Sequence, residues 1–551
     1  MRRGLFAIFF LFIAMLSVQA QAQHRYPIIL VPATDKSGRA IEAQEYQGEK
    51  YPVLKLATES ALLQNLRAVL ATPFLQQELA LAEYARNQRI NELNLPIKKI
   101  GDAHRSLFEP LYLLLSKQEG GFARQGFWLE ASASERKFIN AAFVDMVVDE
   151  RSVKSGEFEE IFAHELGHVI LSYLFGGLPA GNSRKMHASF VTTDYPTAFN
   201  EGYAEHFQPL VRDNTTNENL RRVESGVDLT NLNRFWFSKI DSWLRNQGVR
   251  RNIFVHNKLL PQSAFDEGTD LYQLFIDEET SPYFSFESIK NAQQMMASEG
   301  VIATLFFRLV NDERLRNRYR EGAFYSRFFT DKSPVTDAAK QFTPYQNVML
   351  KLFAAMNEMN RQTLTGDRAM LLETVKNYGK IFPDEKAAVY EVFINTTFGA
   401  TISNTMVRSL EEYAKLGRRG SMQFVERLPA TRKQMQELID KAVRDEVALD
   451  AELGKQLWLL NDGFTIGRTI FNEERTLPLT INLNTASFAE LRTLPDVDFS
   501  VARAILAARA VKGYFKNLEE FREIKGVSPS LIEKLKKMQS AMTAAGKMNR
   551  S

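Results

Sequence analysis

The sequence HELGH at residues 164–168 constrains this chain more than any other feature. On an α-helix, residues four apart lie on one face with Cβ atoms about 5–6 Å apart, so His164 and His168 can bind one metal ion together. Glu165 follows the first histidine directly, and its carboxylate can take a proton from a metal-activated water. We therefore expect His164 and His168 to be metal ligands and Glu165 to be the general base.

The residues around this motif predict the helix that it needs. Apolar side chains recur at i, i+3 and i+4 spacing from Ile161 to Leu174, which gives the helix a buried face. Ser155 is the expected N-cap, and the acidic residues that follow it suit the positive end of the helix dipole. Gly176 and Gly177 mark the expected end of the helix.

A metal site of this kind needs a third protein ligand and an open position for water. Residues 196–207 form the next amphipathic helical pattern, and Glu201 and Glu205 lie together on one face of it. The small residues Ala198 and Gly202 beside them would let this helix approach the first one closely. This second helix is therefore the expected source of a carboxylate ligand.

Taken together, HELGH and the later segment NEGYAE at residues 200–205 resemble the gluzincin metallopeptidases, which are thermolysin-like and aminopeptidase-like enzymes of the zincin fold. The resemblance implies that Glu201 is the third ligand beside His164 and His168, and that Glu165 is the general base. It also implies one Zn²⁺ per chain and a peptide or protein substrate. The segment typical of aminopeptidases does not precede the motif, so the resemblance does not distinguish an exopeptidase from an endopeptidase.

The spacing of the two segments differs from that of the family. Residues 169–200 separate the second histidine from Glu201, which is more than the family's usual gap, so we expect residues 176–196 to be an insertion at the cleft. Asp194, Glu205 and His206 are the alternative third ligands.

The group that stabilises the oxyanion is not selected by spacing. Tyr195, Tyr203, His187 and His206 are all near in sequence, and a side chain of either type can donate a hydrogen bond to a developing negative charge. The strand-like residues 144–148 precede the metal helix, and we expect them to be the edge strand that receives an extended peptide.

Residues 481–538 resemble a paired helix-hairpin-helix domain of the kind in exported DNA receptors of bacterial competence. Such modules hold DNA phosphates with backbone N–H groups at glycine-containing turns. Here the second hairpin keeps one turn glycine, Gly526, with Ser528 at the other position, and the first has Asp496 and Asp498. Carboxylates repel phosphate, although residues 482–551 carry 12 Lys+Arg against 7 Asp+Glu. We expect weak DNA binding at most, and a packing or protein-contact role.

The first residues predict export. A basic start at Arg2 and Arg3, an apolar run over 5–18 and small residues at A-x-A spacing indicate a cleaved signal peptide over residues 1–22. The expected location is periplasmic or secreted, with no transmembrane segment after cleavage. The chain contains no cysteine, so a metal site must use His, Asp and Glu. The net charge of +3 does not suit a dedicated nucleic-acid coat.

The expected fold is α+β and mostly α: a zincin-like metallopeptidase domain with a small mixed sheet, a helical extension and a C-terminal helix-hairpin-helix module. The expected divisions after the signal peptide are an N-terminal region of unknown role (23–130), the metal-binding domain (131–320), a helical region (321–476), the helix-hairpin-helix domain (477–540) and a tail (541–551). The expected function is exported zinc-dependent peptide-bond hydrolysis. The alternatives are a DNA- or envelope-protein-binding factor whose zincin is a scaffold, and a metal-dependent hydrolase of another substrate. The sequence does not predict the oligomeric state.

Overall fold

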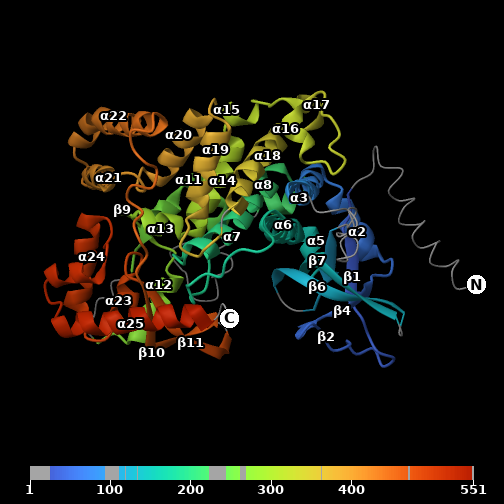
Figure 1. Cartoon of the computed structure of the whole chain (residues 1–551), viewed down its shortest axis with the longest axis horizontal. Helices are drawn as coiled ribbons and strands as arrows, with labels where there is room; N and C mark the ends of the chain where they lie inside the picture. The colour runs from blue at the N-terminus through green and yellow to red at the C-terminus, as the bar shows by residue number, and fades with distance from the viewer. Residues whose placement is uncertain are drawn as a thin grey trace, which may run out of the picture.

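The computed structural model describes residues 25–93, 111–117, 120–132, 135–222, 243–260, 268–361, 363–469 and 472–548. The predicted signal peptide lies outside the described residues. The described chain forms a closed β-sheet near its N-terminal end, a central helical body and a C-terminal module (Figure 1). The mixed α+β prediction is confirmed. Among the described residues, no helix combines the length and the hydrophobicity that a membrane crossing requires.

Five strands close on one another in the order β1-β4-β6-β7-β5, with antiparallel pairs β1–β4 and β6–β7 and parallel pairs elsewhere. Alternate side chains point inward and fill the interior, among them Leu30, Phe127 and Phe143. The sequence predicts a small mixed sheet within residues 131–320, but this sheet is closed and most of its strands come from residues before 131. The strands are β1 (Ile28–Pro32), β4 (Val53–Leu56), β5 (Tyr112–Leu115), β6 (Gly121–Ser132) and β7 (Glu135–Met146), and the short hairpin β2 (Gln44–Tyr46) and β3 (Glu49–Tyr51) extends from them.

The sheet does not follow the division expected at residue 130. That position lies within β6, where Glu130 pairs with Arg136 of β7. Residues 25–130 therefore supply strands to the same sheet as the segment that leads into the metal motif. Furthermore, one continuous core runs from Ile29 to Leu449, so the segments on either side of residue 320 share a single hydrophobic interior.

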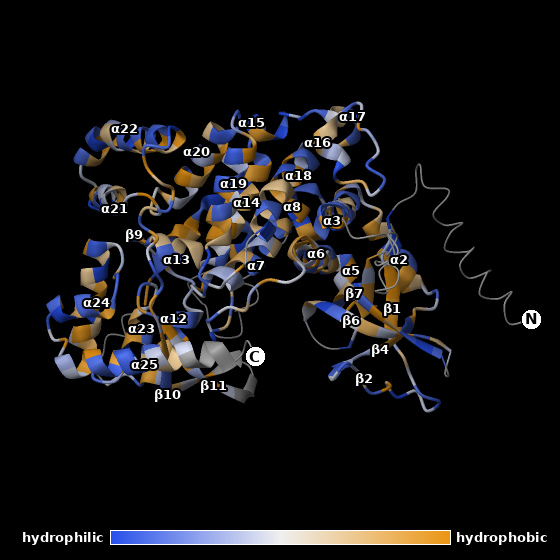
Figure 2. Ribbon diagram, in the orientation of Figure 1, coloured by the Kyte–Doolittle hydropathy of each residue, from blue (hydrophilic) through white to orange (hydrophobic). Residues whose placement is uncertain are grey.

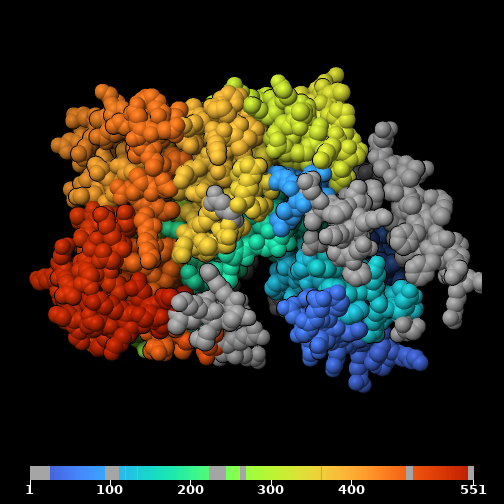
Figure 3. All heavy atoms as spheres, viewed as in Figure 1, coloured from blue at the N-terminus to red at the C-terminus, as the bar shows by residue number. Residues whose placement is uncertain are grey.

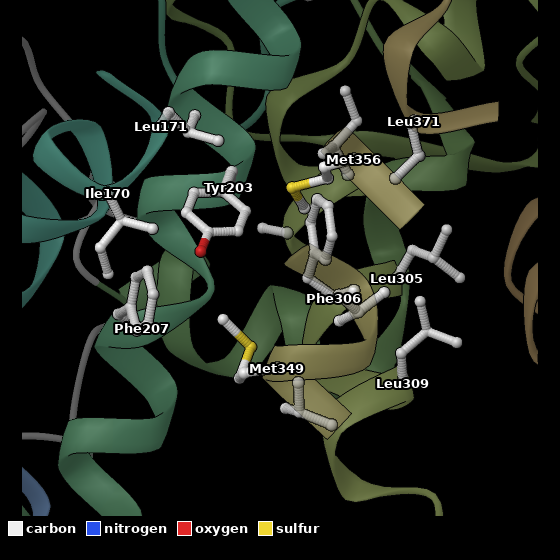
Figure 4. Close-up of a cluster of buried hydrophobic side chains, with 14 of the residues drawn as sticks. Ile170, Leu171, Tyr203, Phe207, Leu305, Phe306, Leu309, Met349, Met356 and Leu371 are labelled. Carbon is white, nitrogen blue, oxygen red and sulfur yellow. The ribbon is translucent and has the colours of Figure 1, made fainter. Parts of the chain in front are cut away.

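The central body is a stack of helices around the motif helix. In Figure 4, Ile170 and Leu171 of α6 face Tyr203 and Phe207, and Phe306 of α14 lies on the other side of Tyr203. Figure 2 shows that hydrophobic residues gather in these central helices and in the closed sheet. The helices that build this region are α2 (Ala61–Leu70), α3 (Pro73–Glu92), α6 (Glu157–Phe175), α7 (Tyr195–Glu205), α8 (Phe207–Asn214), α14 (Glu299–Asn311), α18 (Pro344–Asn357), α19 (Met370–Ile381) and α20 (Lys386–Thr397).

Shorter elements surround this body. Strands β8 (His256–Lys258) and β9 (Phe284–Ile289) pair in an antiparallel ribbon that the helical pattern of this region does not predict. The remaining helices are α5 (Glu150–Ser155), α9 (Glu218–Arg222), the π-helical turn η3 (Leu244–Gly248), α11 (Val249–Arg251), η4 (Ile253–Val255), α12 (Leu271–Thr280), α13 (Ala292–Met296), α15 (Glu313–Arg316), α16 (Gly322–Ser326), α17 (Ala338–Gln341), η6 (Glu358–Arg361), α21 (Asn404–Arg418) and α22 (Gln423–Val443).

The C-terminal module, defined here as residues 457–548, has its own hydrophobic core. It begins with the antiparallel hairpin β10 (Trp458–Thr469) and β11 (Asn472–Asn482) and continues with α23 (Phe488–Arg492), α24 (Phe499–Lys512), η7 (Leu518–Glu523) and α25 (Pro529–Met548). The helical region expected at residues 321–476 therefore ends earlier than predicted, because β10 and the start of β11 lie within it. Figure 3 shows the surface hollowed between the closed sheet, in blue and cyan, and the rest of the molecule.

Candidate metal centre

The motif helix α6 forms as predicted except at its first residue. Ser155 is not its N-cap, because α5 ends there and Gly156 turns the chain into α6 with a φ of 85°. A Cβ at Gly156 would lie 2.6 Å from the Cβ of Leu220, so this left-handed turn requires glycine. The helix ends at Gly176, also left-handed, as the sequence predicts.

The structure brings together the three predicted ligands. Nε2 of His168 lies 3.3 Å from Oε2 of Glu201, and Nε2 of His164 lies 3.6 Å from the same oxygen. The three ligand atoms all lie within 4.8 Å of one another. A tetrahedral zinc ion with bonds of about 2.0–2.1 Å separates its ligand atoms by about 3.3–3.4 Å. The separations of 3.3 and 3.6 Å are therefore close to those of a zinc site, and the donor set of two imidazoles and one carboxylate suits that metal.

Close packing of α6 on α7 makes this geometry possible. A Cβ at Gly167 would lie 2.9 Å from Cα of Ala204 and 2.9 Å from the ring of Phe207, so only glycine allows this approach. The sequence predicts this role for Ala198 and Gly202, and for Gly202 the prediction is wrong. A Cβ at Gly202 would lie 2.4 Å from the carbonyl oxygen of Glu299, so Gly202 allows the approach of α14 instead.

The alternative third ligands lie elsewhere. Asp194 is the N-cap of α7, where its carboxylate accepts hydrogen bonds from the backbone N–H groups of Thr197 (2.8 Å) and Ser183 (2.6 Å). Glu205 and His206 are fully buried, and neither they nor Asp194 join the ligand group found in the described part of the chain.

His206 is buried as a neutral imidazole. Burial lowers its pKa to about 3, and its Nδ1–H group donates to the carbonyl oxygen of Tyr203. That bond fixes the tautomer of the ring, and the buried ring packs within the helical body.

Ionisation at the centre suits metal binding. Burial alone would raise the pKa of Glu201, but the neighbouring imidazoles of His168 and His187 hold it well below its ordinary value. Burial lowers the pKa of His168, but the carboxylate of Glu201 more than offsets this and raises it to about 9. The carboxylate is thus ionised at neutral pH, and a metal ion entering the site would displace a proton from the imidazole of His168.

A cleft of about 560 Å³ opens beside the three ligands. One wall is the start of β6, residues 121–124, and the other includes residues 177–179, Gly181 and His187. Glu165 borders this cleft next to β6, since a Cβ at Gly121 would lie 2.9 Å from Oε1 of Glu165. The predicted general base therefore lies beside the ligands and against the β6 wall.

The prediction that residues 144–148 form an edge strand is wrong. Residues 144–146 belong to β7, which pairs with β5 on one side and with β6 on the other. The strand residues that border the cleft are 121–124 of β6 together with Ala142 of β7. In the described part of the chain, β4 pairs with β6 only at Trp128 and Leu129, which leaves the segment 121–124 beyond the end of that pairing.

Of the four candidates for stabilising the oxyanion, His187 alone is among the described residues that line the cleft. Its Nδ1 lies 3.4 Å from Oε2 of Glu299 and 3.6 Å from Oε2 of Glu201, and 47% of its side chain is exposed. Tyr195 and Tyr203 are buried in the core.

Sequence reasoning missed Glu299. This carboxylate is almost fully buried at the start of α14, where an acidic residue is otherwise explained by the helix dipole. The contact between Glu299 and His187 forms only when α14 packs against α7, because that packing brings the carboxylate to the imidazole. The acid before an otherwise apolar helix was the one available signal, and it is not specific.

A model of the helix-hairpin-helix motif matches residues 479–538. No curated protein and no solved structure matches the chain. The C-terminal module therefore contains a helix-hairpin-helix motif, which suggests nucleic-acid binding.

The two hairpin turns of this module differ in charge. At the first turn, Asp498 caps α24 by accepting from the N–H group of Val501 at 2.8 Å, which places a carboxylate where a phosphate would bind. At the second turn, Gly526 has a φ of 87° and the neutral hydroxyl of Ser528 accepts from the N–H group of Leu531. The support for nucleic-acid binding is therefore weak.

Proposed function

We propose that this chain is an exported zinc-dependent metallopeptidase of gluzincin type. The observation that carries the proposal is the placement of Glu201, whose Oε2 lies 3.3 Å from Nε2 of His168 and 3.6 Å from Nε2 of His164, close to the spacing of ligand atoms in a tetrahedral zinc site. A zinc ion held there acts as a Lewis acid and lowers the pKa of water near it.

The chain's own residues then divide the proton transfers. Glu165 takes a proton from the attacking water and later gives it to the leaving amine. His187 donates a hydrogen bond to the oxygen on which negative charge develops, and Glu299 orients its ring. The buried position of Glu299 supports this, because a fixed carboxylate holds an imidazole in one orientation.

The cleft wall supports a peptide as substrate. An extended peptide can add to a strand through backbone hydrogen bonds, with alternate side chains on either side. Residues 121–124 of β6 border the cleft next to Glu165, beyond the end of the pairing with β4. A peptide along this segment would present its carbonyl groups to the metal centre.

The test is a comparison of Glu165→Gln with Glu157→Gln, a control at an exposed position in the first turn of the same helix. We expect about one zinc per chain in the parent and both variants. Glu165→Gln should lose peptide cleavage by about a thousandfold or more, because a general base and the orientation of the water are lost together. Cleavage of a peptide library by this variant at the parent's rate would make the mechanism wrong. Absence of bound zinc in the parent would make the site wrong.

The second candidate function is a DNA- or envelope-protein-binding factor that uses the metal domain as a scaffold, and the helix-hairpin-helix motif favours it. The full chain should then shift duplex DNA, with an affinity that falls steeply as salt rises. We expect no shift at physiological salt, because Asp498 occupies the first turn. A salt-dependent shift without chelator-sensitive cleavage would favour this candidate. Chelator-sensitive cleavage of a substrate other than peptide would favour a different hydrolase.

A further inference from the structure

The loop between α6 and α7, residues 177–193 and here called the cleft loop, supplies one wall of the metal cleft. Its residues Gly177, Leu178, Pro179 and Gly181 line the cleft together with His187. A loop of this length has no regular structure of its own to fix its path, so contacts from outside must hold it.

Part of that support comes from the C-terminal module, almost three hundred residues later in the sequence. The hydroxyl of Thr480 donates to the carbonyl oxygen of Asn182 at 2.7 Å. Nη1 of Arg184 donates to the carbonyl oxygen of Pro478 at 2.9 Å. Thr480 and Pro478 both lie on β11. The hairpin therefore holds the middle of the cleft loop at Asn182 and Arg184, which precede His187 by five and three residues.

A buried ion cluster adds a third point of contact. Nζ of Lys185 lies 3.3 Å from Oε2 of Glu490 on α23 and 3.4 Å from Oε1 of Glu279 on α12. The three side chains are only 5–7% exposed. Moving Lys185 away would leave carboxylates buried without their cation, which is strongly unfavourable, so the cluster ties the loop to one position.

The module is itself fixed to the helical body. The side-chain amide of Asn291 donates to the carbonyl oxygens of Asn484 (2.8 Å) and Gly513 (3.0 Å), and that of Asn482 donates to Gln293. The backbone N–H group of Ala489 donates to Glu278 of α12. These bonds give the module the rigidity needed to position a loop. In Figure 1 the module lies below α7 and α13.

We propose that the C-terminal module serves as an intramolecular clamp that holds the cleft loop against the metal centre and so sets the position of His187. The clamp itself follows from these contacts, and its effect on catalysis rests on the proposed function. Arg184, Lys185 and Thr480 are positioning residues in this scheme, since they act on the centre through the loop.

The test uses the full chain and the variants Thr480→Val and Arg184→Ala. The matched control is Thr485→Val, since the hydroxyl of Thr485 also donates to a backbone carbonyl, but to that of Asn482 within the module. Hydrogen exchange of the peptides that cover residues 178–190 is measured by mass spectrometry in all four proteins. We expect exchange there to become at least about tenfold faster in Thr480→Val and Arg184→Ala, and to stay within about twofold of the parent in the control.

Peptidase activity and zinc content provide the second readout. We expect kcat to fall about tenfold in both clamp variants with KM changed less and one zinc retained, because the loop affects the transition state through His187. Unchanged exchange in the cleft loop of both clamp variants would overturn the proposal even if the enzyme is active. A parent without zinc or cleavage would overturn the proposed function instead, and the exchange result would still decide whether the clamp exists.

Discussion

Replacement of Gly167 by alanine tests whether the metal centre depends on the close approach of two helices. The added Cβ would lie 2.9 Å from Cα of Ala204 and from the ring of Phe207. Carbon atoms in ordinary contact are about 3.5–4.0 Å apart, and Ala204 presents backbone that cannot rotate away. The two helices must therefore separate by about 0.5 Å or more at this level.

That separation matters more for the metal than for the fold. Alanine is favoured over glycine in a helix by about 1 kcal/mol, which offsets part of an overpacking cost of about 1–3 kcal/mol. The net loss of stability is about 0–2 kcal/mol. In contrast, metal–ligand distances tolerate about 0.2 Å. Because His168 lies on α6 and Glu201 on α7, we expect the zinc affinity of Gly167→Ala to fall at least about tenfold, or about 1.4 kcal/mol.

The measurement is competition for zinc with a chromogenic chelator, accompanied by urea unfolding of the same samples. Gly268→Ala is the control, because a Cβ there would meet nothing within 4 Å. A zinc affinity of Gly167→Ala within about threefold of the parent would refute the reasoning. A variant that loses zinc only because it has unfolded would be revealed by the urea curve.

Two further predictions concern single side chains. Burial raises the pKa of Glu78 to about 8, so the folded state keeps a proton that the unfolded state releases near pH 4.5. The contribution of this group to the stability of the fold is therefore complete below about pH 4.5 and is lost as pH rises to about 8. At pH 7, Glu78→Gln should be more stable than the parent by up to about 3 kcal/mol. Equal urea midpoints for parent and variant at both pH 5 and pH 8 would contradict this prediction. For His187→Ala we expect kcat to fall about a hundredfold with zinc retained; loss of zinc in that variant would show His187 to be a ligand instead.

The sequence was most informative where the chemistry is local. The i, i+4 histidines and the glycine stop predicted α6 and its ligand-bearing face, because helical geometry alone fixes which residues lie together. It was wrong where a local rule had several solutions. Ser155 and Gly156 are both acceptable helix starts, and only the short helix before them decides for the glycine.

Strand pairing was harder to predict for the same reason. Residues 144–146 read as a strand, but whether a strand lies at an edge depends on partners far away in the sequence. Here the partner β5 covers β7 and leaves the start of β6 beside the cleft. Likewise, residues 477–480 have no strand signal that separates them from a connector, and they become part of β11 by pairing with β10.

By itself, the sequence determined the pair of imidazoles with the adjacent carboxylate and the second helix with Glu201, since helical spacing fixes which of these residues share a face. It identified the helix-hairpin-helix segment through its resemblance to a known domain. The tertiary structure places Glu201, and not Glu205 or Asp194, beside the histidines, as the family resemblance implies. It alone decided that Gly167 permits this approach and that Glu299 lies against His187. It also decided that the C-terminal module holds the cleft loop. These are contacts between segments far apart in the chain, and their geometry is fixed by how whole helices pack, which no short stretch of sequence encodes.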